Sequence, residues 1–193
     1  MIYFICSKPH QQPVIEEMIQ SITINSTITF DDEFSGTIYS STEDIQSLEL
    51  LCQHLQTEGT FTLTMLHSIN YPKLSHAVLH FQNQQYPGSF HHILELFIIA
   101  MNQQNKAILN EFVNFYINLP KDHLELVKEY SKTDNIILTA NNLYVHRNTV
   151  TNRLHQFEKL TQLDLKDNNL RMLLRLIDIY INNVHDAQDT YYK

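Results

Sequence analysis

Glycine is the feature that most restricts the fold of this chain, because only three glycines occur among its 193 residues. Glycine adopts positive φ angles without steric cost, and tight turns between short strands depend on it. Proline is also scarce, with five residues. A sandwich or barrel of many short strands is therefore disfavoured, and we expect a helix-rich chain. Hydrophobic residues make up 43 % of the sequence, which is enough for a packed core and argues against disorder.

The first part of the chain mixes strand and helix signals. Four segments rich in β-branched and aromatic residues predict strands, at residues 2–6, 26–30, 36–40 and 61–69. Pro13 suits the first turn of a helix that reaches about Ile22, and Thr42 suits the N-cap of a helix that Gly59 ends. Residues 74–82 fit either a strand or a helix. Residues 1–88 therefore predict a small α+β domain.

The character of the sequence changes at residue 89. HHILELFIIAM, residues 91–101, is apolar nearly all round, which indicates a helix buried on most faces. A further helix is expected to end before Pro120. Near the C-terminus an amphipathic stripe predicts a helix packed in the core of a bundle, and its residues are Leu170, Leu173, Leu174, Ile177 and Ile181. The second part of the chain is thus expected to be all-α.

Within this part, residues 137–165 combine two helices with an unusual polar surface. Residues 137–143 predict a short helix, 144–146 are too few for anything but a tight turn, and a second helix follows. Its apolar residues recur at helical spacing on one face, at Val150, Leu154, Phe157 and Leu160. Its other face carries Arg147, Asn148, Thr151, Asn152 and His155.

That polar face is not built for helix stability, because Asn and Thr are poor helix formers. Asparagine pairs with adenine edges and arginine with guanine edges in the major groove of DNA. The start of the second helix also offers free backbone N–H groups to phosphates. The two helices and the turn between them therefore predict a DNA-binding helix-turn-helix.

The same residues carry a family resemblance. LYVHRNTVTNRLHQFEKLTQLDL, residues 143–165, followed by LRMLLRLIDIYI, residues 170–181, resembles the C-terminal helix-turn-helix of PucR/CdaR-type bacterial transcription regulators. The unbroken Val-His-Arg-Asn-Thr-Val core and the later Arg-Leu and Leu-Asp-Leu steps match the family pattern. Thr151 and Asn152 stand where the family often has basic or aromatic residues, and Gln162 replaces the usual glycine.

The resemblance implies a DNA-binding transcription regulator and assigns roles to individual residues. The DNA-contacting set is His146, Arg147, Asn148, Thr149, Thr151, Asn152, Arg153 and His155. His146 would be the N-cap of the recognition helix, and Arg153 would contact a phosphate. Two alternatives stand beside these roles. In the first, Asn148 only satisfies backbone hydrogen bonds at the end of the helix and does not contact DNA. In the second, Arg153 forms an intramolecular ion pair with an acid such as Glu158 or Asp164 and does not contact a phosphate.

Charge is distributed unevenly along this acidic chain, whose formal net charge is −8. Residues 1–110 hold 3 basic and 10 acidic residues, whereas residues 111–181 hold 9 of each. Since phosphate attraction scales with the number of cations in contact, we expect a homodimer, which doubles the few cations on one face. The domain before residue 89 would serve dimerisation, a small-molecule effector, or both. The alternative is an interaction protein with a degenerate helix-turn-helix, whose acidic surface binds a protein partner.

Other classes of function find little support in the sequence. Two cysteines form neither a disulfide framework nor a metal-ligand set, and no signal peptide or membrane span is indicated, so we expect a cytoplasmic protein. His91 with Glu95 is too small a ligand set for a metal. No phosphate-binding glycine loop or nucleophile elbow occurs, and neither an enzyme nor a cofactor is expected.

We therefore expect an α+β chain with a domain over residues 1–88 and a helical domain over 89–185. The helix-turn-helix would lie at about 134–165 within the helical domain, and residues 186–193 would form a flexible tail.

Overall fold

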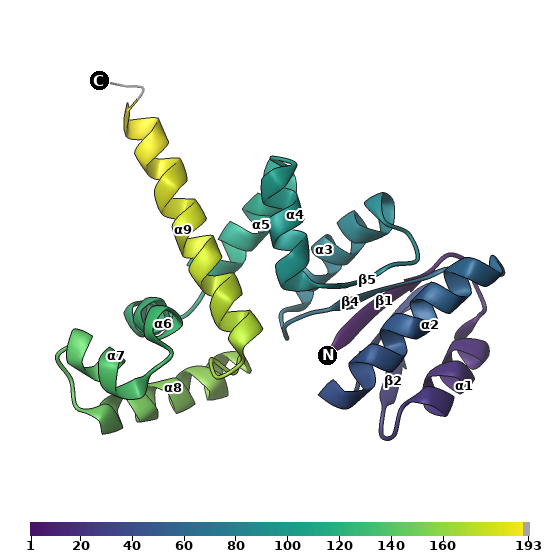
Figure 1. Ribbon diagram of the computed structural model, residues 1–193, viewed down its shortest axis with the longest axis horizontal. Helices are drawn as coiled ribbons and strands as arrows, with labels where there is room; N and C mark the ends of the chain where they lie inside the picture. Colours follow the sequence, from purple (N-terminus) through teal and green to yellow (C-terminus); the bar gives the residue numbers. More distant parts are fainter. Residues whose placement is uncertain (191–193) are drawn as a thin grey trace. The chain divides into compact units, whose positions relative to one another are not determined.

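The computed structural model of the chain describes the backbone of residues 1–190 and the side chains of residues 1–183 (Figure 1). The chain divides into two compact units, Met1–Ile99 and Ala100–Lys193. The first unit contains a mixed five-stranded sheet with helices, and the second is all-helical. The predicted α+β class is therefore confirmed.

The first unit is built around its sheet. The strands are β1 (Ile2–Cys6), β2 (Thr27–Phe30), β3 (Ser35–Tyr39), β4 (Leu63–His67) and β5 (Phe90–His92). The helices are α1 (Gln12–Ile22), the 3₁₀ turn η1 (Thr42–Asp44), α2 (Ile45–Glu58) and α3 (Pro72–Gln85). The strand order is β2-β3-β1-β4-β5, with every pair antiparallel except β4 and β5, which run parallel.

Alternate residues of the central strand β1 face opposite sides of the sheet, as the two-residue period of a strand requires. Ile2, Phe4 and Cys6 belong to the core that α1 and α2 cover. Tyr3 points to the other side, where its ring meets that of His76 in α3 at 5.3 Å between centroids. The sheet is thus a layer between helices on both faces, which buries its apolar strands.

The secondary structure of two segments was ambiguous or wrongly predicted from the sequence, because it depends on contacts with other elements. Residues 74–82 lie within the helix α3, with Pro72 in its first turn. His91 and His92, predicted to begin a helix, lie in the strand β5 instead, and α4 begins at Ile93. The buried Gln82 amide donates to the carbonyls of Met65 and Ser89, both at 3.0 Å, and so holds the start of β5 along β4.

The start of α2 also differs from its prediction. Ser41, not Thr42, is the N-cap, and a 3₁₀ turn precedes the α-helix. The buried Asp44 carboxylate accepts hydrogen bonds from the hydroxyls of Ser40 at 2.7 Å and Ser41 at 2.8 Å. These bonds favour the charged carboxylate and lower the pKa of Asp44. The predicted end of the helix is confirmed, because Gly59 caps it with φ of 70°.

The division between the two units falls within α4 (Ile93–Asn102), so the second unit begins with the last residues of that helix. Its helices are α5 (Lys106–Ile117), α6 (Lys121–Thr133), α7 (Ile136–Asn142), α8 (Arg147–Thr161) and α9 (Asn168–Thr190). The predicted boundary at 88/89 precedes this division, because β5 pairs with β4 and therefore belongs with the sheet. The predicted tail starts inside α9, whose backbone is helical to Thr190, and residues 191–193 lie outside the described residues.

Helix α9 is the element on which α5 and α6 pack. Leu170, Leu173, Leu174 and Ile177 of its predicted stripe are buried. Asp178 ties all three helices together, because it accepts a hydrogen bond from the Tyr116 hydroxyl at 3.1 Å and pairs with the Lys128 ammonium at 2.8 Å. Across the described part of the chain, no helix is both long and apolar enough to span a bilayer.

Candidate nucleic-acid interface

Helices α6, α7 and α8 surround one small hydrophobic core. Leu126 of α6, Ala140 of α7 and Val150 of α8 are its buried centre. Ala140 suits this packing, since a small side chain at 4 % exposure lets the helices approach closely. The hydroxyls of Thr133 and Thr139 lie 2.6 Å apart and join the end of α6 to α7. Three short helices are thereby fixed against one another.

The turn between α7 and α8 is tight, as its length predicted. Tyr144 has a positive φ of 54°, and the N–H of Val145 donates to the carbonyl of Ala140 at 3.0 Å. His146 is the N-cap of α8, where its Nδ1 accepts a hydrogen bond from the N–H of Asn148 at 3.2 Å. The predicted capping role of His146 is therefore confirmed. The cap sets the direction in which α8 leaves the turn.

Helix α8 presents the predicted contact set on its surface. Val150 and Phe157, both at 0 % exposure, define the buried side of the helix. Seven of the eight predicted DNA-contacting residues are exposed and Thr149 is half-buried; the exposed ones are His146, Arg147, Asn148, Thr151, Asn152, Arg153 and His155. The helix therefore turns its polar side chains outward as a group.

Both arginines of this surface are available to a ligand. In the part of the chain whose side chains are described, neither Arg147 nor Arg153 forms an ion pair. The alternative pairing of Arg153 with Glu158 or Asp164 is therefore not observed. Glu158 instead lies 4.0 Å from the Nδ1 atom of His155. A cation without an intramolecular partner needs no bond to be broken before it meets a phosphate.

The structure exposes three further residues on or beside α8 that the sequence prediction omitted, and it corrects the predicted burial of one residue. Gln156 and Lys159 are exposed on α8, and Tyr144 in the turn is 96 % exposed. The signal for Gln156 was its position four residues after Asn152, on the same side of a helix. Leu160, predicted to lie on the apolar face, is 67 % exposed, so that part of the prediction is wrong.

A buried arginine, Arg171, holds the segment that follows α8. The sequence prediction assigned this residue no role beyond its place in the stretch that resembles the family. The helix ends at Gln162, which adopts the left-handed conformation with φ of 57° despite the missing glycine. Beyond it, the Arg171 guanidinium donates to the carbonyls of Leu165 at 2.9 Å and Lys166 at 2.6 Å and pairs with Asp134 at 2.7 Å. Arg171 therefore connects the end of α6 to the turn between α8 and α9.

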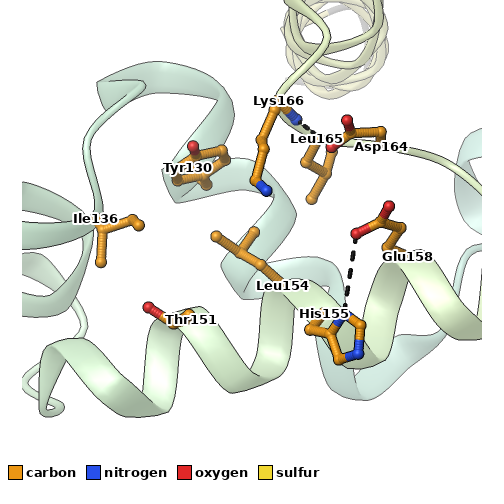
Figure 2. Close-up of a pocket in the computed structure, with 9 residues that line it drawn as sticks. All are labelled: Tyr130, Ile136, Thr151, Leu154, His155, Glu158, Asp164, Leu165 and Lys166. Atoms are coloured by element: carbon orange, nitrogen blue, oxygen red, sulfur yellow. Dashed lines mark hydrogen bonds and ion pairs between the residues drawn. The ribbon is translucent and has the colours of Figure 1, made fainter.

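A pocket of about 200 Å³ lies beside α8 (Figure 2). Thr151, Leu154 and His155 form its α8 wall, and Tyr130 and Ile136 face them from α6 and α7. Figure 2 shows the Lys166 side chain reaching between Tyr130 and Leu154. The volume is below the range of roughly 300–1,000 Å³ that small-molecule sites occupy. Thr151 and His155 therefore lie at the edge of the outward face, next to this hollow.

The first unit offers less chemistry. An open hollow of about 470 Å³ lies on α1 and α2, where Ile22, Leu50 and Leu51 line it together with Ser47 and His54. His91 and Glu95 pair with each other at 3.2 Å. Among the described residues no group of three or more His, Cys, Asp or Glu side chains is arranged to hold a metal ion.

A three-helix core, a short turn and a capped, exposed helix with two unpaired arginines define a helix-turn-helix domain. Residues 124–177 match the family model of the PucR C-terminal helix-turn-helix domain, so this segment is a domain of that family. The predicted resemblance is confirmed. PucR-type regulators are typically non-enzymatic.

Two further comparisons concern the chain beyond this segment. No protein of curated function matches it. Among solved structures, it is similar to the crystal structure of a regulator of polyketide synthase expression from Bifidobacterium adolescentis, with 17 % sequence identity and a TM-score of 0.45. The similarity covers 96 % of this chain and 80 % of that one.

Proposed function

We propose that this protein is a cytoplasmic bacterial transcription regulator that binds double-stranded DNA as a homodimer. Helix α8 enters the major groove, with its exposed side chains between Arg147 and His155 toward the bases and phosphates. The observation that carries the proposal is the exposed polar face of α8 with two unpaired arginines, within a PucR-type helix-turn-helix domain. The N–H groups at the start of α8 add donors and a positive dipole end for a phosphate.

Charge determines how such binding depends on conditions. With 3 basic and 10 acidic residues in 1–110, the first part of the chain repels phosphates. On α8 only Arg147, Arg153 and Lys159 oppose this repulsion, so affinity would be modest and would fall steeply as salt rises. A dimer would present two such surfaces to half-sites about 34 Å apart on one side of the duplex. Residues before the helical region would supply dimerisation, effector sensing or both.

The test is retention of fragments of the protein's own genome by the purified full chain, at low salt and then at increasing salt. We expect specific fragments that contain an inverted repeat, and their loss as salt increases. Each of Arg147→Ala and Arg153→Ala should reduce the slope of log affinity against log salt by about 1, as the loss of one phosphate contact predicts.

Arg175→Ala is the matched control, because Arg175 is an exposed arginine of α9 that forms no ion pair among the described side chains. It should leave the retained fragments and the salt slope unchanged. Retention of no fragment at any salt would contradict the proposal. In that case the acidic interaction protein becomes the better hypothesis, and a cellular effect that survives Arg147→Ala would support it.

A further inference from the structure

Three side-chain amides form a ridge along α8. Asn148, Asn152 and Gln156 are spaced four residues apart, which stacks side chains along one side of a helix. All three are exposed, and no hydrogen bond engages their side chains within the described part of the chain. Two asparagines of neighbouring helices, in contrast, have engaged side chains. Asn135 caps α7, and Asn142 donates to Glu129 at 2.6 Å.

This amide ridge lies on the outward side of the helix. Each residue advances by roughly 100° around the axis, so two residues correspond to about 200°. Asn148 precedes the fully buried Val150 by two positions and Asn152 follows it by two. Both amides therefore point almost directly away from the core. Gln156, one position before the buried Phe157, lies further toward one flank.

The two unpaired arginines flank the ridge on opposite sides. Arg147 comes one residue before Asn148, and Arg153 comes one residue after Asn152. A single step is roughly 100° around the helix, and the two steps run in opposite senses. A neutral, hydrogen-bonding centre thus lies between two cations. The major groove has the matching arrangement, with base edges at its floor and phosphates along both walls about 12 Å apart.

We propose that the amide ridge makes this protein select adenine bases, with Asn148 and Asn152 each reading one adenine of a half-site and Gln156 adding a third contact beyond them. The inference rests on the proposed function. An asparagine amide accepts from adenine N6–H with its oxygen and donates to N7 with its nitrogen. Guanine presents two acceptors there, so it leaves the amide oxygen without a donor.

The helix geometry also gives the spacing of these bases. Four residues of an α-helix rise by about 6 Å, and successive base pairs rise by about 3.4 Å. Asn148 and Asn152 therefore address adenines about two base pairs apart when α8 lies along the groove. Arg147 and Arg153 would contact phosphates and contribute affinity without distinguishing one base from another.

The experiment is selection from a pool of random-sequence duplexes by the full chain at low salt, followed by sequencing. We expect two enriched adenines about two base pairs apart in each half-site. Asn148→Ala should erase the preference at one of these positions and Asn152→Ala at the other. Each should reduce discrimination against other bases by roughly fivefold to a hundredfold and leave the salt slope unchanged. Asn152→Asp should shift its position toward cytosine, whose amino group a carboxylate accepts.

The control is Asn110→Ala, which removes an exposed amide from α5 and should not change the selected sequence. Thermal melting confirms that each variant folds. If duplexes are retained but carry no paired adenines, or if both α8 alanine variants select the same sequence as the original chain, the amide ridge does not read bases, while the proposed function stands. If no duplex is retained at low salt, the proposed function itself fails and the inference fails with it.

Discussion

Replacing Arg171 by alanine should loosen the second unit at the point where α8 ends. Arg171 is only 7 % exposed, and its guanidinium donates to the carbonyls of Leu165 and Lys166. The same group pairs with the Asp134 carboxylate at 2.7 Å, and its centre lies 5.9 Å from the centre of the Tyr130 ring. Alanine would leave two carbonyl groups without a donor and would disconnect α6 from the turn before α9.

The magnitude follows from these contacts. Hydrogen bonds from a charged group contribute about 1.5–3 kcal/mol each, so the two carbonyl bonds account for about 3–6 kcal/mol. Asp134 has a side chain that is 59 % exposed, and solvent therefore limits its ion pair to about 1 kcal/mol or less. Water that enters the vacated space restores part of the loss. We expect Arg171→Ala to destabilise the unit by about 3–4 kcal/mol, in line with the removal of one partner from a buried charged network.

Amide hydrogen exchange with mass spectrometry measures this locally, which matters in a chain with two compact units. Because about 1.4 kcal/mol is a tenfold change, protection of residues 162–170 should fall by about a hundredfold or more. Arg175→Ala, an exposed arginine on the same helix, should change protection by less than about 0.5 kcal/mol. A fall of less than tenfold for Arg171→Ala, or an equal fall for both variants, would refute the reasoning.

Three further predictions concern the first unit. In Gly36→Ala the new Cβ would collide with the carbonyl oxygen of Thr29, so we expect a lower urea midpoint and a decrease in unfolding free energy of about 2 kcal/mol or more. Gly59→Ala is the comparison, because a Cβ there meets no other atom and only the positive φ is unfavourable. It should lower the unfolding free energy by about 1 kcal/mol. The pKa of Asp44 is lowered from 3.8 by neighbouring serine hydroxyls, so its contribution to stability is complete above that pH and is lost as the pH falls through the lower folded pKa. Urea midpoints of Asp44→Asn should therefore be depressed at neutral pH and should approach those of the original chain in acid, and a constant difference would contradict this. Burial raises the pKa of the Cys52 thiol to about 12, so iodoacetamide at pH near 8 should leave this thiol unlabelled until urea unfolds the unit. Rapid labelling of Cys52 in the folded protein would contradict its burial.

The candidate site shows where sequence periodicity is sufficient. The spacing of Val150, Leu154 and Phe157 predicted which side of α8 is buried, because neighbouring turns of one helix place these residues together whatever the rest of the chain does. Leu160 continues that spacing and yet is exposed. The core of the three helices contains Val150 and Leu154 but does not extend to Leu160. Periodicity gives a face of a helix, whereas burial also requires an element opposite it.

The first unit shows where local signals fail. Residues 74–82 fitted both a strand and a helix, and His91 and His92 were predicted to begin a helix. The Gln82 amide, buried in α3, donates to carbonyls of β4 and of the segment before β5. Met65 and Ser89, which accept these hydrogen bonds, are far apart in the sequence, so no local pattern near residue 90 predicts the strand. Edge strands as short as β5 form because a neighbouring strand offers them hydrogen bonds.

The sequence by itself determined the parts of this protein that depend on neighbours within a few residues. These include the cap at His146, the turn before α8 and the outward polar face of that helix, since capping bonds and helical spacing act over one or two turns. Only the tertiary structure decided which charges are free and which are engaged. Arg171 and Arg153 are the same residue type in one matching stretch, but the carboxylate of Asp134, 37 positions earlier in the chain, pairs with the first, while the second is exposed to solvent. That difference depends on contacts between segments that only folding brings together.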